Sequence, residues 1–480
     1  MARGQRRGVR AEGYRVPFEV LDLSYMEALQ TLHAACKFGI QPMLETVVDM
    51  LAELGDPDLS FRSLQIAGTN GKTSTSRYAA AILRGQGLRV ALYTSPELVS
   101  LTERMEVDGV PVSEGTFACG VAAAAEAGRR VNIRRRASGE RPYDVTQFDI
   151  LTVAACVAFA QADVDVAVLE CGMGGRWDAT SAVKSIEAVA VTGVGLDHTR
   201  ILGDTLEAIA GEKAAIIRCG QSCVLGVGTA TPDSVEDVFL DRCRSQDVTP
   251  VLLRPECLED AAGEMHAGVP RRHASLLRAS YRITSRPRRL GAPLELTVRT
   301  PRRAYTGLTA LKPSYQAANI ACAVTLTEAF LDGELDGDRL LESVRQCPTP
   351  GRFSLLRPNP PVLVDACHNP QSVDAFLAAL QDIAPDPATR PPLLCAVLAD
   401  KDVGGIVSRL ARAFPAVVCT QTSSSRSLGA DELVRRFLAA GATVTGSYGS
   451  VAAALAAMSA GPLVGCGSIT LAGALAALLA

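Results

Sequence analysis

The clearest chemical potential of this chain lies in a glycine-containing segment within its first hundred residues. An apolar run at 62–67 ends at Gly68, and the sequence TNGKT at 69–73 leads into a run with helical apolar spacing. A strand, a glycine loop and a helix in this order aim backbone N–H groups and a helix N-terminus at phosphate oxygens. Lys72 would then reach the terminal phosphates. Although Ile66 occupies the first glycine position of the strict G-x-x-x-x-G-K spacing, the segment predicts binding of a nucleoside triphosphate.

Three further strand-like runs each lead into a polar residue that could bind metal or phosphate: Ser95 after 88–94, Glu170 after 164–169 and His198 after 187–194. Open α/β sheets place their ligands at this end of their strands. A carboxylate that ends a buried strand before a glycine-rich turn resembles the group that holds a nucleotide's metal, and its burial without a partner would be costly. Lys213, in a predicted helix at 211–217, would point back toward the same edge.

Two more segments predict a second edge that faces the nucleotide. The sequence DACHNP at 365–370 follows one strand-like run, and LADKD at 398–402 follows the next. Each segment could form an ordinary turn by itself, whereas the two together place acidic, basic and amide side chains at neighbouring strand ends.

Strand-like and helix-like runs alternate through most of the chain, which is typical of a wound α/β fold. Proline and glycine at 346–352 (QCPTPGR) mark a boundary. We expect a disordered tail at 1–20, a nucleotide-binding P-loop domain with a parallel-rich sheet at 21–347, and a smaller Rossmann-like α/β domain at 348–480. The elements expected in the smaller domain are strands at 361–366, 393–398, 416–420, 442–446 and 463–466, and helices at 371–381, 404–413, 430–440 and 450–459.

The composition restricts the classes of function. The 480 residues are 48% apolar and 21% charged with a net charge of −3, which fits a soluble globular protein and argues against a general polyanion binder. Fourteen cysteines without a C-x-x-C pair indicate reduced thiols rather than disulfides or zinc. No stretch has the pattern of a secretory signal or a membrane span, so we expect a cytoplasmic protein without a membrane partner.

Arginine-rich stretches at 129–141 and 270–289 are expected to be surface loops or edge strands. Aromatic residues are scarce in them, so solvated charge is favoured over a nucleic-acid surface, and no nucleic-acid partner is expected.

Taken in order, these segments resemble the folylpolyglutamate synthase/dihydrofolate synthase family, a branch of the Mur ligase superfamily. The resemblance runs from about residue 38 to residue 468 and includes GTNGK, YTSP, ERMEVDGVPVSE, LECGMGGRWDAT, GLDHTRILGDTLEAIAGEKAAII, PGR, DACHNP and LADKD. It implies a Mur-ligase-type central domain and an ATP-dependent ligase that adds L-glutamate to dihydropteroate or reduced folates through an acyl phosphate, releasing ADP and phosphate. The partners would be small molecules, and a monomer is expected because the family is commonly monomeric.

The resemblance also implies roles for individual residues. The nucleotide would be held by Gly68, Thr69, Asn70, Gly71, Lys72, Thr73, Asn319, Arg352 and Asp365. Magnesium would be bound by Ser95, Glu170 and His198, and Lys213 matches a lysine that carries a carbamate and ligates a second magnesium ion. Lys72, Lys213 and His198 would be the catalytic groups. The acid substrate would lie against Thr146, Phe148, Arg176 and Asp178.

Some positions depart from the family pattern, mainly near the implied substrate. Asp149 stands where the family usually has Glu, Trp177 replaces an aliphatic residue, and Tyr315 replaces the usual His. These departures leave open a paralogous ligase that joins another amino acid or amine to a different carboxylic acid. Whether the first glutamate, later glutamates or both are added also stays open.

Two interpretations from other classes fit less well. A P-loop NTPase with a mechanical or regulatory role would not need Lys213 behind His198, nor the domain that begins with DACHNP. A degenerate binding protein would be expected to have lost Lys72, Glu170 or His198, and all three are present.

Overall fold

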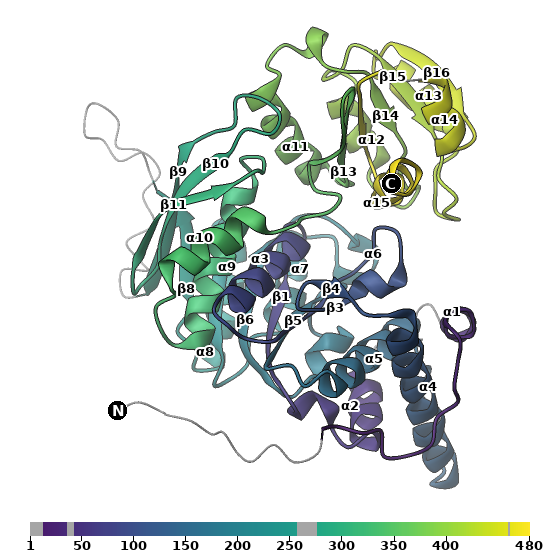
Figure 1. Ribbon diagram of the computed structural model, residues 1–480, viewed down its shortest axis with the longest axis vertical. Helices are drawn as coiled ribbons and strands as arrows, with labels where there is room; N and C mark the ends of the chain where they lie inside the picture. Colours follow the sequence, from purple (N-terminus) through teal and green to yellow (C-terminus); the bar gives the residue numbers. More distant parts are fainter. Residues whose placement is uncertain (1–12, 36–42, 257–275, 459–460) are drawn as a thin grey trace.

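The computed structural model describes residues 13–35, 43–256, 276–458 and 461–480. The described chain forms a larger α/β unit around one mixed sheet and a smaller α/β unit around a second sheet, as Figure 1 shows. The segment that connects the two units lies between Gln346, where the larger unit ends, and Ser354, where the first strand of the second sheet begins. It is the proline- and glycine-containing segment noted in the sequence. The expected α/β fold class is therefore confirmed.

The first sheet is parallel in its centre and antiparallel at both ends. Its strand order is β11-β10-β9-β8-β7-β6-β1-β5-β2-β3-β4, and the run from β9 to β2 is parallel. The strands are β1 (Arg62–Ala67), β2 (Val90–Tyr93), β3 (Met105–Val107), β4 (Val110–Pro111), β5 (Val166–Glu170), β6 (Ile186–Gly193), β7 (Ser222–Gly228), β8 (Val251–Pro255), β9 (Leu277–Ser285), β10 (Leu294–Arg299) and β11 (Ala304–Ala310).

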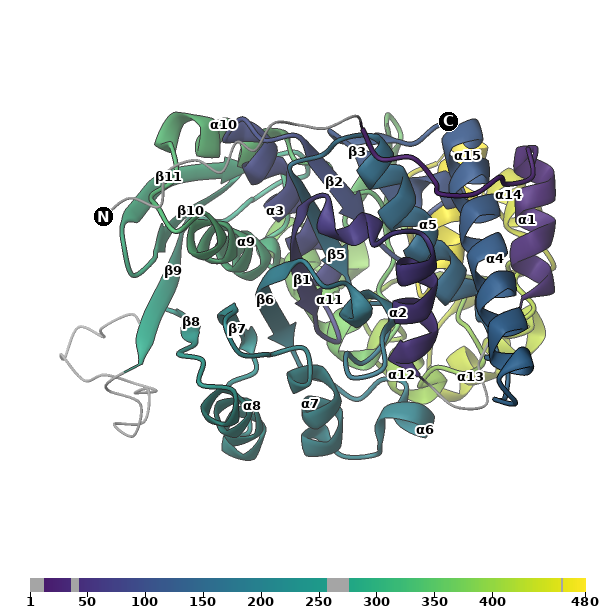
Figure 2. The same ribbon diagram turned by 90° about the horizontal axis from the view of Figure 1, so that it is seen from below.

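Helices cover both faces of this sheet, which explains why its central strands read as continuous apolar runs (Figure 2). One apolar core lies under α3, α9 and α10, and a second lies under α1, α2, α4, α5, α7 and α8. The helices are α1 (Tyr25–Ala34), α2 (Leu44–Glu53), α3 (Lys72–Gly85), α4 (Glu114–Ala137), α5 (Gln147–Gln161), α6 (Thr199–Leu202), α7 (Leu206–Ala214), α8 (Asp233–Ser245), α9 (Gln316–Leu331) and α10 (Gly337–Gln346).

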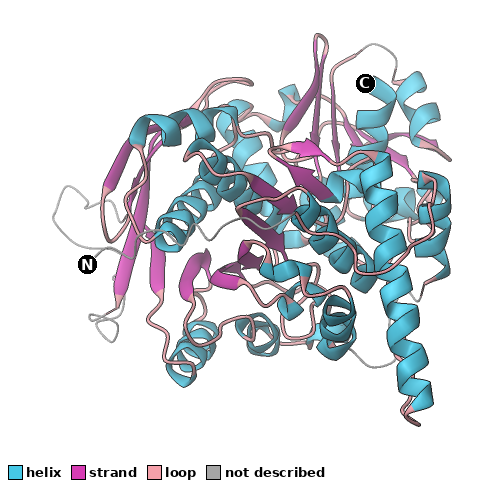
Figure 3. Cartoon of the chain, turned by 60° about the horizontal axis from the view of Figure 1, so that its bottom comes forward, coloured by secondary structure: helices cyan, strands magenta, loops and turns pink. Residues whose placement is uncertain are grey.

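The second sheet has the order β12-β13-β17-β14-β15-β16 and is parallel except for the β12–β13 hairpin. Figure 3 shows its helices flanking the strands. The strands are β12 (Ser354–Pro358), β13 (Pro361–Asp365), β14 (Leu393–Cys395), β15 (Val417–Thr420), β16 (Val444–Tyr448) and β17 (Leu463–Cys466). The helices are α11 (Pro370–Ile383), α12 (Val403–Leu410), α13 (Ala430–Ala439), α14 (Val451–Ala457) and α15 (Ile469–Leu479). All five expected strands and all four expected helices are confirmed, whereas β12 and α15 were not anticipated.

The expectation for the arginine-rich stretches is wrong for residues 129–137 and 277–285, whereas residues 138–141 and 286–289 lie in loops, as expected. Residues 129–137 belong to α4, where Arg134, Arg135 and Arg136 occupy the last turn, the helix end that favours positive charge. The second stretch contains β9, which is an interior strand because β10 and β11 continue the sheet beyond it. Residues 270–275 lie outside the described residues.

The disordered tail predicted at 1–20 is wrong for residues 13–20. Tyr14, Val16, Phe18 and Val20 pack against the core that lies under α1, α2, α4, α5, α7 and α8, and the Tyr14 hydroxyl donates to the Leu54 carbonyl at 2.9 Å. The alternation of apolar and polar residues, which pins this extended segment to the surface of the core, was the signal that the tail prediction overlooked. Residues 1–12 lie outside the described residues. No helix of the described chain is long and apolar enough to span a membrane.

Candidate active site

The glycine loop between β1 and α3 has the form that the sequence predicts. Gly71 precedes the first residue of α3 with a φ of 85°, in the left-handed region that favours glycine. A Cβ atom there would clash with the side chain of Asn319. The Lys72 ammonium folds back and donates to the carbonyl of Gly68 at 3.0 Å. The loop therefore presents its amides and one lysine at the carboxyl edge of the sheet.

Glu170 ends β5 at the same edge and is almost fully buried, with 1% exposure. The Thr73 hydroxyl donates to its Oε1 at 2.8 Å, and the Ser95 amide donates to its Oε2 at 3.4 Å. Burial raises the pKa of Glu170, although the charge on Lys72 and the Thr73 hydrogen bond act in the opposite direction. A cation in front of this carboxylate would restore its charged form.

Lys213 approaches the same edge from the last turn of α7 and is 3% exposed. Burial, together with repulsion from the charge on Lys72, lowers the pKa of Lys213 to about 7. Its amine is therefore largely neutral at mildly alkaline pH, which is the form that reacts as a nucleophile.

One cavity of about 320 Å³ unites the predicted nucleotide, metal and catalytic residues. Those that line it are Gly68, Thr69, Asn70, Gly71, Lys72, Thr73, Ser95, Glu170, His198, Lys213, Asn319, Arg352 and Asp365. These residues come from eight separate segments of the chain and surround a single space between the two α/β units.

The residues also suit magnesium, although no group of three His, Cys, Asp or Glu side chains close enough for a metal occurs in the described chain. Magnesium is usually held by one or two carboxylates together with phosphate oxygens and water. The oriented carboxylate of Glu170, which lines the cavity together with Ser95 and His198, fits that chemistry. Burial, with the charge on Lys401, lowers the pKa of His198 to about 4, so its imidazole is neutral at pH 7, as a metal ligand must be.

A second group of polar contacts connects α9 to the smaller unit. The Tyr315 hydroxyl donates to Asp365 Oδ2 at 2.7 Å, and the backbone amides of Phe353 and Cys367 donate to the same carboxylate at 2.9 Å. Burial raises the pKa of Asp365, opposed by the charge on Arg352. Tyrosine at the position where the family usually has histidine therefore keeps a hydrogen bond to the smaller unit.

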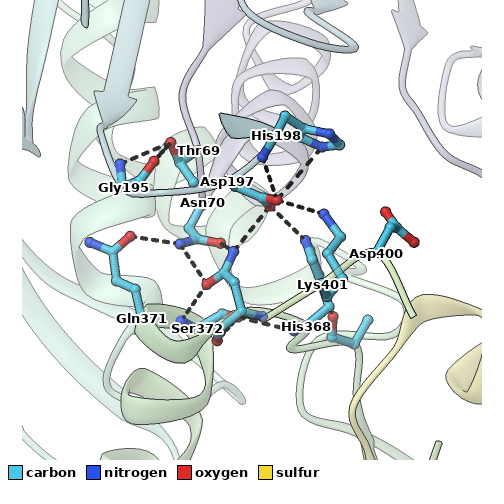
Figure 4. A network of polar contacts seen from close by, with 12 residues as sticks. Thr69, Asn70, Gly195, Asp197, His198, His368, Gln371, Ser372, Asp400 and Lys401 are labelled. Carbon is cyan, nitrogen blue, oxygen red and sulfur yellow. Dashed lines mark hydrogen bonds and ion pairs between the residues drawn. The ribbon is translucent and has the colours of Figure 1, made fainter. Parts of the chain in front are cut away.

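Asp197 is the centre of a network that joins the two units (Figure 4). Its carboxylate accepts from the Lys401 ammonium at 2.7 Å and lies 3.5 Å from His368 Nε2 and 3.4 Å from Asn369 Nδ2. Burial disfavours the carboxylate, but the hydrogen bonds from His368 and Lys401 outweigh it and hold the pKa of Asp197 far below its usual value.

Asn70 of the glycine loop extends this network. Its amide nitrogen donates to Gln371 Oε1 at 2.8 Å, and Asn369 Nδ2 donates to Asn70 Oδ1 at 3.1 Å. Sequence reasoning missed these pairings across the interface, and it did not single out Asp197, Lys401 or Gln371. The two predicted strand-end edges were the available signal, because ligand-binding edges that share one nucleotide must face each other.

The four residues expected at the acid substrate do not line this cavity, and their contacts are structural. Thr146 caps α5 in a reciprocal capping box with Asp149, and Phe148 packs on Gly172. Arg176 donates to Glu212 Oε1 at 2.8 Å. The substrate role of these residues stays a prediction.

Asp178 is the most informative of the four. Its Oδ2 accepts from the Met173 amide at 2.9 Å, and its Oδ1 accepts from the hydroxyl and amide of Thr180 at 2.5 and 3.1 Å. The carboxylate therefore holds in place the loop whose residues Gly172, Met173 and Gly174 form a wall of the cavity.

Removing one end of the Asp197–Lys401 pair should separate the two units. Lys401 and Asp197 have side chains only 7% and 10% exposed. Removing one partner of a buried ion pair costs up to about 3–5 kcal/mol, and the cost here is smaller because His368 and Asn369 still face the Asp197 carboxylate. We expect Lys401→Met to open the interface, measured as a larger radius of gyration by small-angle X-ray scattering. Arg426→Met, which breaks an exposed pair with Asp400 within the smaller unit, is the control. An unchanged radius of gyration for Lys401→Met would show that this pair does not hold the two units together.

Comparisons with known proteins identify the two units as known domains. The Mur ligase middle domain matches residues 66–227, and the Mur ligase glutamate ligase domain matches residues 351–467. The dihydrofolate synthase/folylpolyglutamate synthase of Mycobacterium tuberculosis is 33% identical over 84% of this chain and 78% of that protein. A probable bifunctional folylpolyglutamate synthase/dihydropteroate synthase of Haloferax volcanii is 33% identical over 90% of this chain, and the chain spans about half (47%) of that relative's length.

Among solved structures, the Mycobacterium tuberculosis folylpolyglutamate synthase complexed with ADP and AMPPCP is similar to this chain. The TM-score is 0.81 at 28% identity, over 95% of this chain and 99% of that chain.

Proposed function

The chain belongs to the folylpolyglutamate synthase/dihydrofolate synthase family of Mur ligases, and we propose that it is an ATP-dependent ligase that joins L-glutamate to the carboxylate of dihydropteroate, reduced folates or both. The observation that carries this proposal is the single cavity in which Lys72, Glu170, Lys213 and Arg352 converge between the two units. The nucleotide-bound relative of similar fold supports the use of ATP.

The proposed reaction has two steps. A carboxylate oxygen of the acid attacks the γ-phosphorus of ATP, and the bond from that phosphorus to the bridging oxygen breaks. ADP is released and the acid becomes an acyl phosphate. The amine of glutamate then attacks the acyl carbon, loses a proton, and the tetrahedral intermediate expels inorganic phosphate. Both steps bring anions together or build negative charge, so fixed cations and helix N-termini provide the main stabilisation.

The chain's own residues perform defined tasks in this scheme. The loop amides and the N-terminus of α3 bind phosphate oxygens, and Lys72 neutralises charge on the transferred phosphoryl group. Arg352 contributes a second cation from the smaller unit. Asn319 and Asp365 would contact the nucleotide. Contacts between the units, centred on Asp197, exclude water that would hydrolyse an acyl phosphate.

Magnesium would be held by Ser95, Glu170 and His198, with Lys213 as a carbamate for a second ion, and it would offset the charge of the phosphates. Asp178 supports the Gly172–Gly174 wall, against which we place the acid substrate. Asp149 completes the Thr146 capping box as a glutamate would, so that departure from the family pattern does not argue for a different substrate.

The test is release of ADP against a panel of acids. We expect dihydropteroate or a reduced folate to release ADP only when L-glutamate is present. Turnover that occurs only with a different acid, or only with a different amine, would contradict this proposal. It would instead indicate a paralogous Mur-type ligase.

The proposed carbamate makes a separate prediction about pH. A carbamate forms when a neutral amine attacks CO₂ and releases a proton. Because the pKa of Lys213 is lowered to about 7, raising the pH through 7 deprotonates the amine and favours the carbamate. With ¹³C-labelled CO₂ held at constant concentration, we expect a protein carbamate resonance that grows from pH 6 to pH 8 and is absent in Lys213→Met. Identical spectra for the two proteins would remove the carbamate from the account.

A further inference from the structure

A second and larger cavity lies along the interface between the two units. It measures about 630 Å³, and no residue that lines it also lines the candidate active site. Its walls come from α3, the β3–β4 hairpin, the β9–β10 connection, the segment that joins the two units, β12 and α11. This volume is within the range of small-molecule binding sites, about 300–1,000 Å³.

The walls of this cavity carry more unpaired positive than unpaired negative side chains. Among the described residues, the side chains of Lys312 and Arg289 line the cavity without a hydrogen bond or an ion pair. The carboxylate of Glu106 is paired with Arg77 at 2.7 Å, and that of Glu103 accepts from the amides of residues 98–100. Both carboxylates of the lining are therefore engaged, whereas two cations are not.

Within the part of the chain that the structure describes, two buried polar atoms of the lining residues also lack hydrogen-bond partners. They are Nε of Arg77, whose side chain is 10% exposed, and Oγ1 of Thr349, which is 2% exposed. The large majority of buried side-chain polar atoms in proteins have a hydrogen-bond partner. Burial, with repulsion from Arg77, also lowers the pKa of Lys312, which an anion nearby would reverse.

The rest of the lining is apolar and partly open to solvent. Leu311 and Leu355 are 62% and 41% exposed, and Leu290, Phe353 and Ile383 continue the apolar surface inward. Contiguous apolar surface of this kind is found in ligand-binding grooves.

We propose that this cavity is a second ligand site, for an organic anion that places a carboxylate or phosphate group at Lys312 and an apolar body against Leu290, Phe353 and Leu355. A ligand there would contact both units and the segment between them, so it would favour the domain arrangement seen here. The site is separate from the proposed ligase reaction, and it stands or falls independently of that function.

The probe is 8-anilinonaphthalene-1-sulfonate, an organic anion with an apolar body whose fluorescence rises on binding. The full chain is titrated in the presence of saturating magnesium and AMPPCP, which occupy the candidate active site. We expect saturable binding that Lys312→Met weakens about tenfold or more, whereas Lys312→Arg keeps it and Arg289→Gln weakens it less. Lys184→Met, which removes a surface lysine paired with Asp56, is the matched control.

Uncharged N-phenyl-1-naphthylamine separates charge recognition from apolar contact. Its binding should be unaffected by Lys312→Met. Equal affinity of the sulfonate for the parent and Lys312→Met would overturn the proposal, as would its displacement by AMPPCP.

Discussion

Replacing Lys72 by methionine is expected to lower kcat by about 10³-fold or more while the fold is retained. Cations that stabilise a transferring phosphoryl group contribute on the order of 10³–10⁵ in rate. Among the described residues, the Lys72 ammonium makes hydrogen bonds only to the carbonyls of Gly68 and Thr69 in its own loop, so its loss leaves the packing of α3 unchanged. Steady-state kinetics with thermal unfolding measured in parallel would test this.

Lys184→Met serves as the control for the loss of a lysine, because Lys184 lies on the surface and pairs with Asp56. We expect its kcat to match that of the parent. A Lys72→Met variant that turned over at a rate near the parental one would exclude Lys72 from phosphoryl transfer.

Replacing Glu170 by glutamine is expected to raise the magnesium concentration for half-maximal activity by about tenfold or more. The amide keeps the shape of the side chain and can still accept the Thr73 hydrogen bond, but it removes the charge that would attract the cation. Magnesium titrations of activity for the parent and the variant provide the measurement, and superimposable curves would refute a metal role for Glu170.

The same variant has a second expected effect, on stability without metal. Because burial raises the pKa of Glu170, the folded protein holds its proton more tightly than the unfolded chain does. The carboxylate therefore destabilises the fold at neutral pH, and this cost diminishes as the pH falls. We expect Glu170→Gln to unfold at an equal or higher temperature than the parent at pH 7 without magnesium.

Local signals explain which parts of the site could be predicted. The loop around Gly71 and the carboxylate of Glu170 follow apolar strands directly, so a few neighbouring residues determine where they lie. The contact between Asp197 and Lys401 joins residues 204 positions apart on different units, and no local pattern encodes such a pairing. The sequence pattern identified the two segments that contain Asp197 and Lys401, but it did not predict that these two side chains are in contact.

The same distinction explains the errors in the fold. Arg134, Arg135 and Arg136 suggested a loop because charge dominates the local composition, whereas the preceding alanine-rich turns and the helix C-terminus accommodate them. The contacts of Asp178 could not be predicted either, because a carboxylate beside glycines is compatible both with binding a ligand and with stabilising a loop. In the structure, Asp178 accepts hydrogen bonds from Met173 and Thr180 and so stabilises the loop.

The central claim is that the acid substrate is activated as an acyl phosphate, and isotope transfer tests it most directly. Dihydropteroate or the accepted folate, labelled with ¹⁸O in both oxygens of the reacting carboxylate, is converted with ATP, magnesium and L-glutamate, and the released phosphate is analysed by mass spectrometry. We expect one ¹⁸O atom in the phosphate for each amide formed. Amide formation accompanied by unlabelled phosphate would contradict it.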